Sequence, residues 1–240
     1  MNQNDPNIAS LEIVAESLGD LCKELVLVGG CSVGLLISDP ASPPVRETTD
    51  VDLVAEVTNV GEYYQLGDKL SQRGFRQSAE AEHICRWTKG PLKLDVMPSS
   101  SDVLGHSTNL WYPEVVATAH EIALSNGSIV LVVSPPLFLA TKLVAFYDRG
   151  FLIVDGVRFP DYAGSHDLED IINVIDGRPE LAHEVENASD SVRNYLRDEF
   201  DELLADTNFV DVIPMHLRTD AASQARASIV LERLRRLAGL

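Results

Sequence analysis

Two adjacent prolines, Pro135 and Pro136, divide the sequence into parts of different character. Before them lie short runs rich in β-branched residues, which are typical of strands. After them lie longer stretches with apolar residues at helical spacing. Strands gathered in one part and helices in the other indicate separate layers or domains. We therefore predict an α/β domain over residues 1–134 and a helical domain over residues 135–240.

The periodicity of apolar residues predicts the individual elements within each part. In the first part the predicted strands are 25–28, 50–57, 83–88, 92–96 and 128–133, and the predicted helices are 8–24, 31–38 and 61–73. In the second part the predicted helices are 137–147, 165–175, 189–205 and 221–238, and residues 151–164 are predicted to form a long loop.

The composition, with 45% hydrophobic and 23% charged residues, is that of a globular protein. The sequence has no apolar run of about eighteen residues, so no membrane span is predicted. Its first residues, MNQNDPNIAS, have neither a basic start nor an apolar core and predict no signal peptide. The cysteines Cys22, Cys31 and Cys85 follow no disulfide or metal spacing. Such a set favours reduced thiols and a cytoplasmic location.

The formal net charge of −18 opposes binding of nucleic acid unless basic residues gather locally. A local concentration of arginine occurs on the helix predicted at 221–238, at Arg226, Arg233, Arg235 and Arg236. Arg226 and Arg233 are seven residues apart and share a helical face. That face either meets phosphates of an acceptor nucleic acid, or belongs to a solvated helix whose arginines offset acids elsewhere. The sequence leaves both readings open.

Two aspartates separated by one residue, Asp50 and Asp52, carry the main chemical signal. On a strand they lie on the same face, about 7 Å apart along the chain. Asp95, isolated among alternating apolar residues, supplies a third acid on the strand predicted at 92–96. Three carboxylates are hard oxygen ligands that suit Mg²⁺ or Mn²⁺. Ions held in this way serve phosphoryl transfer, and Asp95 is also a candidate base.

A glycine turn precedes these acids in the sequence. Gly29 and Gly30 follow a buried strand, and a Gly-Gly turn lets backbone N–H groups approach a triphosphate. The helix predicted from Cys31 presents its positive end there, and Ser32 adds a hydroxyl. A pair of spaced aspartates alone is more often a solvated strand face than a metal site. The order of strand, Gly-Gly turn, helix, aspartate strand and third aspartate favours the metal site.

These segments together resemble the polymerase-β type of nucleotidyltransferase, whose pattern is a Gly-Gly or Gly-Ser turn, two spaced aspartates and a later acid. More closely, the chain resembles the AbiEii type of toxin nucleotidyltransferases, which include the MenT-like toxins. The chain departs from the pattern at Cys31, where serine or threonine is common, and in the loop 38–45, which lengthens the spacing before the aspartates. The resemblance covers roughly residues 20–180, on the segments 27–30, 46–53, 94–96, 140–149 and 165–171.

In the helical part, Lys142 lies in an otherwise almost wholly apolar helix, so it must snorkel, pair or face a polar cleft. Arg149 is seven residues further on, on the same face. Asp167 and Asp170 follow Ser165, a good N-cap, and acids there ordinarily stabilise the helix dipole. The resemblance implies instead that Lys142 and Arg149 meet the triphosphate and that Asp167 reaches the active site and orients Lys142.

The resemblance implies a nucleotidyltransferase domain with a mixed sheet, a helical C-terminal domain and an active site in the cleft between them. It implies transfer of a nucleoside monophosphate from an NTP to an acceptor hydroxyl, with tRNA as acceptor. The chain would then be the toxin of a bacterial toxin–antitoxin or phage-defence system, with a cognate antitoxin as partner. One alternative is a small-molecule nucleotidyltransferase of the aminoglycoside-modifying kind, whose cationic acceptor suits an acidic chain. The other is a non-catalytic nucleotide-binding module.

Overall fold

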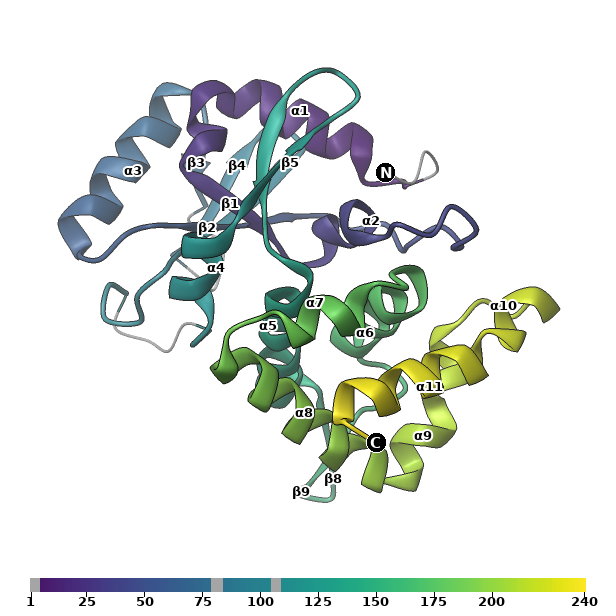
Figure 1. Ribbon diagram of the computed structural model, residues 1–240. Coiled ribbons are helices and arrows are strands. Elements are labelled where there is room, and N and C mark those ends of the chain that lie inside the picture. The colour runs from purple at the N-terminus through teal and green to yellow at the C-terminus, as the bar shows by residue number, and fades with distance from the viewer. Residues whose placement is uncertain (1–4, 79–83, 105–108) are drawn as a thin grey trace. The chain divides into compact units, whose positions relative to one another are not determined.

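The computed structural model describes residues 5–78, 84–104 and 109–240. The chain forms two compact units, whose elements are labelled in Figure 1. The sheet unit comprises Asn4–Gly34 and Arg46–Ser134, and the helical unit comprises Leu35–Val45 and Pro135–Leu240. The predicted mixed α/β architecture with helices at the C-terminal end is confirmed.

The sheet unit is built on a seven-stranded mixed sheet in the order β3-β4-β5-β2-β1-β7-β6. Its strands are β1 (Leu25–Val28), β2 (Val51–Ala55), β3 (Arg76–Gln77), β4 (Arg86–Lys89), β5 (Leu92–Pro98), β6 (His120–Ala123) and β7 (Ile129–Val132). Its helices are α1 (Ile8–Leu18), η1 (Gly19–Lys23), η2 (Gly30–Ser32), α3 (Val60–Gln72) and α4 (Tyr112–Thr118). The helix α2 (Val33–Leu36) carries the chain from this unit into the other.

Strand β2 occupies the middle of the sheet and pairs differently on its two sides. It runs antiparallel to β1 and parallel to β5. Strand β1 is buried at all four positions, as expected of a central strand with a continuous apolar run. Strand β5 alternates between buried and more exposed positions after Leu92, so one face is left for polar side chains. This alternation puts Asp95 outside the hydrophobic core.

The helical unit contains α5 (Pro135–Arg149), α6 (His166–Gly177), α7 (Leu181–Glu186), α8 (Asp190–Ala205), α9 (Thr207–Val212), η3 (Ile213–His216), α10 (Ala221–Ala225) and α11 (Ala227–Ala238). Helix α5 is buried on every side between residues 135 and 143, which makes it the core of the unit. It packs against α6 and α8, and α11 packs against both of these helices. Across the residues that the structure describes, every helix is too short or too polar to cross a membrane.

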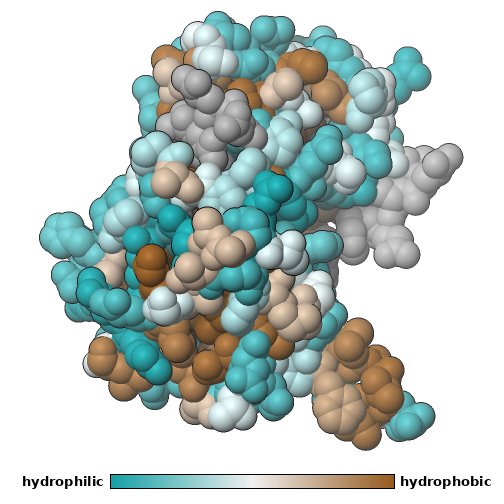
Figure 2. Space-filling model, turned by 90° about the vertical axis from the view of Figure 1, so that its right-hand side faces the viewer, coloured by the Kyte–Doolittle hydropathy of each residue, from teal (hydrophilic) through white to brown (hydrophobic). Residues whose placement is uncertain are grey.

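The prediction of a loop over residues 151–164 is wrong in its first part. Strands β8 (Phe151–Val154) and β9 (Val157–Pro160) form an antiparallel hairpin there. Asp155 and Gly156 make its turn with φ of 51° and 80°, as a two-residue turn matched to the twist of the strands requires. Its exposed apolar side chains form a brown group in Figure 2 and are Leu152, Ile153, Val154, Val157 and Phe159.

Most predicted elements are present, with shifted ends. The opening helix ends at Leu18 and continues as η1, and the C-terminal helix is broken at Arg226 into α10 and α11. The predicted strand 83–88 corresponds to β4, while residue 83 lies outside the described residues. The three cysteines are free thiols, and all are buried. The sequence reading omitted β3, α4, β6, α7 and α9.

Two arginines of the C-terminal segment, Arg226 and Arg233, are engaged within the helical unit. The Nε atom of Arg226 donates to both oxygens of Asp176 at 2.7 and 2.8 Å, and its Nη2 donates to Asp39 at 2.8 Å. Arg233 donates to the main-chain oxygen of Ile175 at 2.7 Å. These contacts favour the reading in which the arginines offset acids elsewhere, because Arg226 pairs with buried Asp176 and with partly exposed Asp39.

Replacing Arg226 with methionine should leave Asp176 buried without its counter-charge. We expect the free energy of unfolding to fall by about 3–5 kcal/mol at pH 7, measured by urea denaturation. Burial raises the pKa of Asp176, so the deficit relative to wild type should shrink as the pH falls and that carboxyl takes up a proton.

The control for this substitution is Arg236→Met. Arg236 pairs with Glu232 on the surface, where both side chains are more than 60% exposed. Its loss should cost less than about 1 kcal/mol. A similar loss in both variants, or an Arg226→Met deficit that stays constant down to pH 4, would contradict the assigned role of Arg226.

Candidate active site

The turn after β1 brings the backbone of Gly29 against the carboxylate of Asp52. Gly29 has φ 67° and ψ −164°, a conformation open essentially to glycine. A Cβ atom on Gly29 would lie 2.0 Å from Asp52 Oδ2. Antiparallel pairing of Val28 with Asp52 fixes this approach. The Gly-Gly turn and the second aspartate therefore form one packed unit.

Cys31 ties this turn to the segment that leads into β2. Its Sγ lies 2.6 Å from the Thr48 hydroxyl and donates to the main-chain oxygen of Asp50 at 3.1 Å. Burial raises the pKa of the Cys31 thiol to about 12, so it stays protonated. Ser32 is buried, and its hydroxyl donates to the main-chain oxygen of Gly29 at 2.8 Å. Both side chains thus hold the turn in shape.

The N-terminal segment fixes the approach to Asp50 from the other side. The Asn7 side chain accepts from the main-chain N–H of Thr48 at 2.8 Å and donates to the main-chain oxygen of Arg46 at 3.0 Å. Asn7 is 1% exposed, so both contacts are shielded from water. Two residues shortly before the aspartate pair, Arg46 and Thr48, are therefore held by a side chain that the sequence analysis did not single out.

The parallel register of β2 and β5 sets Asp52 directly beside Asp95. Across the β4–β5 hairpin, Arg86 is the partner of Asp95. The Arg86 guanidinium donates to both Asp95 oxygens, Nε at 2.8 Å and Nη2 at 2.5 Å. The same Nη2 donates to Asp50 Oδ2 at 2.9 Å. One cation thus joins the first and third predicted acids.

Arg86 was missed in the sequence analysis, although a signal for it exists. The turn at Gly90 and Pro91 places Lys89 opposite Leu92. Three residues further from the turn on each strand, Arg86 is therefore the partner of Asp95. A charge-assisted, two-nitrogen contact between them was therefore readable from the turn position.

The carboxylates of Asp50, Asp52 and Asp95 fit a divalent cation by the chemistry of their donor atoms. Arg86 already stands in for a cation at two of them, which shows that this side of the sheet collects positive charge. Among the residues that the structure describes, no three His, Cys, Asp or Glu side chains are arranged so that they could hold a metal ion, and this includes the acids around Arg86. Metal binding at this set would therefore require the side chains to rearrange.

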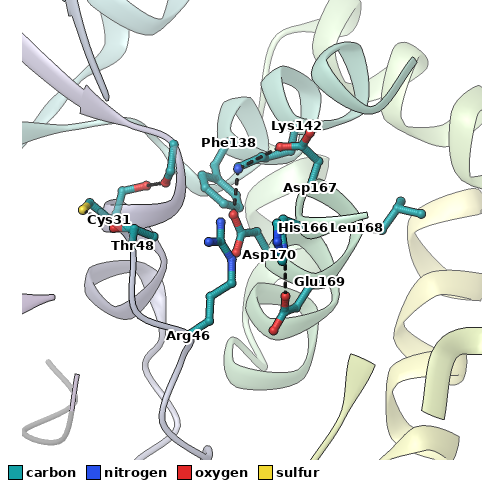
Figure 3. A network of polar contacts seen from close by, with 12 residues as sticks. Cys31, Arg46, Thr48, Phe138, Lys142, His166, Asp167, Leu168, Glu169 and Asp170 are labelled. Carbon is teal, nitrogen blue, oxygen red and sulfur yellow. Dashed lines mark hydrogen bonds and ion pairs between the residues drawn. The ribbon is translucent and has the colours of Figure 1, made fainter. Parts of the chain in front are cut away.

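A second charged cluster lies in the helical unit around Lys142. Its Nζ donates to Asp167 at 3.0 Å and to Asp170 at 2.7 Å (Figure 3). The lysine and both aspartates have side chains no more than 7% exposed. Burial disfavours the charged lysine, but the two carboxylates outweigh it and raise the pKa of Lys142. The sequence left three possibilities for Lys142, namely that it snorkels, pairs or faces a polar cleft, and in the structure it is paired.

Arg149 completes this cluster from the solvent side. It donates from Nε and Nη2 to the two oxygens of Asp167, both at 2.9 Å. Burial opposes ionisation of Asp167, yet the charges of Lys142 and Arg149 prevail and lower the pKa of this carboxyl. Asp167 is therefore a buried carboxylate shared by two cations, and more than a helix-dipole partner.

Beside this cluster, His166 is exposed and lies 3.2 Å from Glu169 (Figure 3). In the sheet unit, Trp87, Trp111 and Tyr112 are buried.

Comparison with known proteins gives similarity at the level of structure. No protein-family description matches the sequence, and no curated protein matches it. An antigenic nucleotidyltransferase-like protein of Paracoccidioides brasiliensis is 21% identical, with a TM-score of 0.49 over 89% of this chain and 94% of its own. JHP933 of Helicobacter pylori is 11% identical, with a TM-score of 0.46 over 98% and 93%. Similarities of this size do not establish a family.

Substitution of Gly29 by alanine should damage the site through its contact with Asp52. The added Cβ would meet Asp52 at 2.0 Å, so we expect a loss of about 2–4 kcal/mol in unfolding free energy. Gly19→Ala is a matched control, because Gly19 also has a positive φ of 56° but no atom within 4 Å of its Cβ position. Adding Asp52→Ala to Gly29→Ala should recover only part of the excess over the control, because the Cβ of residue 52 remains 2.8 Å from the new Cβ. Equal losses at the two glycines would contradict the contact.

Substitution of Asp167 by asparagine should expose the charge balance of the Lys142 cluster. We expect a loss of about 3–5 kcal/mol at pH 7, because two cations lose a buried partner. The lowered pKa of Asp167 means that its contribution is complete above its unfolded value, near 4, and is lost as the pH falls through the lower folded value. The stability gap between wild type and variant should therefore be constant from pH 7 to 5 and close below pH 4.

The control for Asp167 is Asp198→Asn, which changes an acid that is 69% exposed and pairs with Arg197 on the surface. We expect a change of less than about 1 kcal/mol there. Urea denaturation of the three proteins from pH 7 to pH 3 provides the measurement. A gap for Asp167→Asn that persists unchanged at pH 3 would show that the carboxylate charge is not what stabilises the cluster.

Proposed function

We propose that this chain is a metal-dependent nucleotidyltransferase, which moves a nucleoside monophosphate from an NTP to an acceptor hydroxyl. The proposal rests on the register of the sheet, above all on the pairing of β2 with β5. This register sets Asp52 beside Asp95 and against the Gly29 turn, with Asp50 joined to Asp95 through Arg86. A glycine turn and three acids on neighbouring strands are the groups that nucleotidyl transfer requires.

In this proposal Asp50, Asp52 and Asp95 hold Mg²⁺ or Mn²⁺. The bound ions would neutralise the triphosphate and stabilise the attacking and leaving oxygens. Asp95 would also accept the proton of the acceptor hydroxyl. The backbone of Gly29 and Gly30 would meet the phosphates, as expected where glycine leaves N–H groups uncovered.

Ser32 has a more restricted role than the one expected from the sequence. Its hydroxyl is bonded to Gly29, so its proposed contribution is to keep the phosphate-binding turn in shape. For Lys142, Arg149 and Asp167 we propose the roles that the resemblance implies. The two cations would meet the triphosphate, and Asp167 would orient Lys142. Arg149 is 70% exposed but bonded to Asp167, and Lys142 is bonded to two aspartates, so both cations would have to exchange a carboxylate for a phosphate.

Two kinds of acceptor are candidates for this reaction. By resemblance to AbiEii and MenT-like toxins, the acceptor would be tRNA, and the chain would act as a toxin held in check by an antitoxin. A second candidate is a small cationic acceptor, as in enzymes that modify aminoglycosides. The net charge of −18 and the internal engagement of Arg226 and Arg233 favour this second candidate.

Incubation with labelled NTPs, Mg²⁺ and total bacterial RNA, or with a panel of aminoglycosides, tests both candidates. We expect pyrophosphate release with one acceptor class, and a loss of at least about a hundredfold in Asp50→Asn and Asp52→Asn. Asp68→Asn removes an exposed acid from α3 and should leave turnover unchanged. NTP with Mg²⁺ should also raise the thermal midpoint of the wild type, because a ligand that binds the native state stabilises it.

The outcomes separate the proposals. Labelled RNA would support the tRNA acceptor, and a labelled aminoglycoside would support the small-molecule acceptor. Full turnover in either aspartate variant would exclude the assigned metal ligands. Nucleotide-dependent stabilisation without turnover on any acceptor would favour the non-catalytic binding module.

A further inference from the structure

The contact between Arg86 and two of the proposed metal ligands has a consequence for how a metal could bind. A single nitrogen, Nη2, lies 2.5 Å from Asp95 Oδ2 and 2.9 Å from Asp50 Oδ2. Asp50 and Asp95 are also two of the acids that would hold a divalent cation in the proposed site. The guanidinium and such an ion would compete for the same carboxylates, and they carry charge of the same sign.

We propose that the Arg86 guanidinium and a divalent cation exclude one another between Asp50 and Asp95. Arg86 is then a positioning residue that keeps the carboxylate set assembled without metal and sets how much metal is needed to load it. The inference rests on the proposed metal site, and it adds a competitor that belongs to the chain itself.

The charge of the cluster supports exchange of one cation for another. Asp50, Asp52 and Asp95 together carry three negative charges, and Arg86 contributes one positive charge. Without any cation, acids on adjacent strands would repel each other and splay. A divalent ion supplies more charge than a guanidinium, so the exchange is electrostatically favourable once the ion is present in sufficient concentration.

Exposure distinguishes this cluster from the similar cluster in the helical unit. The side chains of Arg86, Asp50 and Asp95 are 30%, 33% and 16% exposed. The Lys142 cluster also has one cation between two aspartates, but its lysine is only 7% exposed. Water and ions can therefore reach the Arg86 contacts, and the arginine side chain has solvent into which it can withdraw.

Arg86 is held at this place by backbone pairing, which explains why it meets the acids at all. It faces Asp95 across the β4–β5 hairpin, and its main-chain oxygen also accepts from Ser78 at 2.9 Å. Backbone pairing fixes its Cα, whereas the long side chain retains several rotatable bonds. A displaced guanidinium can therefore turn away without moving the strand.

The experiment measures Mn²⁺ binding by electron paramagnetic resonance without nucleotide, in about 150 mM salt to screen distant charges. In Arg86→Gln we expect Mn²⁺ to bind about tenfold more tightly than in wild type, while the metal-free thermal midpoint falls. Arg86→Lys keeps the charge but lacks the fork that reaches both acids, so its affinity should lie between the two. Arg76→Gln removes an exposed arginine from β3 of the same sheet and should leave the affinity within about twofold of wild type.

The test is specific because competition predicts that Arg86→Gln binds Mn²⁺ more tightly while its thermal midpoint falls. An arginine with a purely structural role would lower both the thermal midpoint and the affinity for Mn²⁺ when removed. Equal or weaker Mn²⁺ binding in Arg86→Gln and Arg86→Lys would therefore overturn the competition and leave the proposed metal site standing. Absence of Mn²⁺ binding in wild type and both variants would overturn the competition together with that site. If Arg86→Gln does not fold, an unchanged affinity in Arg86→Lys overturns the inference.

Discussion

The sheet unit depends on the placement of β2 between an antiparallel neighbour and a parallel one. Pairing with β1 brings Asp52 to the glycine turn, and pairing with β5 brings Asp95 to Asp52. A shift of one residue in either register would send the acids to the opposite face of the sheet. The buried residues of β1 and β2 oppose such a shift, because it would also expose the core. The packing of apolar side chains thus fixes the geometry of the acids.

One arrangement of charge recurs in both units, namely a single cation shared by two aspartates. Arg86 joins Asp50 and Asp95, Lys142 joins Asp167 and Asp170, and Arg226 joins Asp39 and Asp176. In these three clusters one cation offsets two carboxylates. Their access to water falls from the Arg86 cluster through the Arg226 cluster to the Lys142 cluster, so exchange with a dissolved cation is easiest at Arg86.

Residues close in sequence were the ones whose contacts could be predicted. The strand at 25–28, the glycine turn and the alternation that isolates Asp95 follow from local pattern, and the structure has all three. The hairpin 151–160 and the Arg86 partner were also readable from their two-residue turns, but were missed. The bond between Arg226 and Asp39 spans 187 residues and leaves no local signal. The inclusion of residues 35–45 in the helical unit is likewise set by distant packing.

The pairing of the basic residues bears on the kind of acceptor that the proposed enzyme would attract. Electrostatic attraction of a polyanion needs cations whose field reaches solvent. Arg226 is 19% exposed and bonded to two aspartates, and Arg233 is bonded to backbone carbonyls. The charge of Arg226 is offset at short range by its two aspartates, so it reduces little of the field that the net charge of −18 presents to an approaching molecule. In the proposed function an NTP would overcome this repulsion only together with cations, whereas a cationic acceptor would be attracted by the same field that repels RNA.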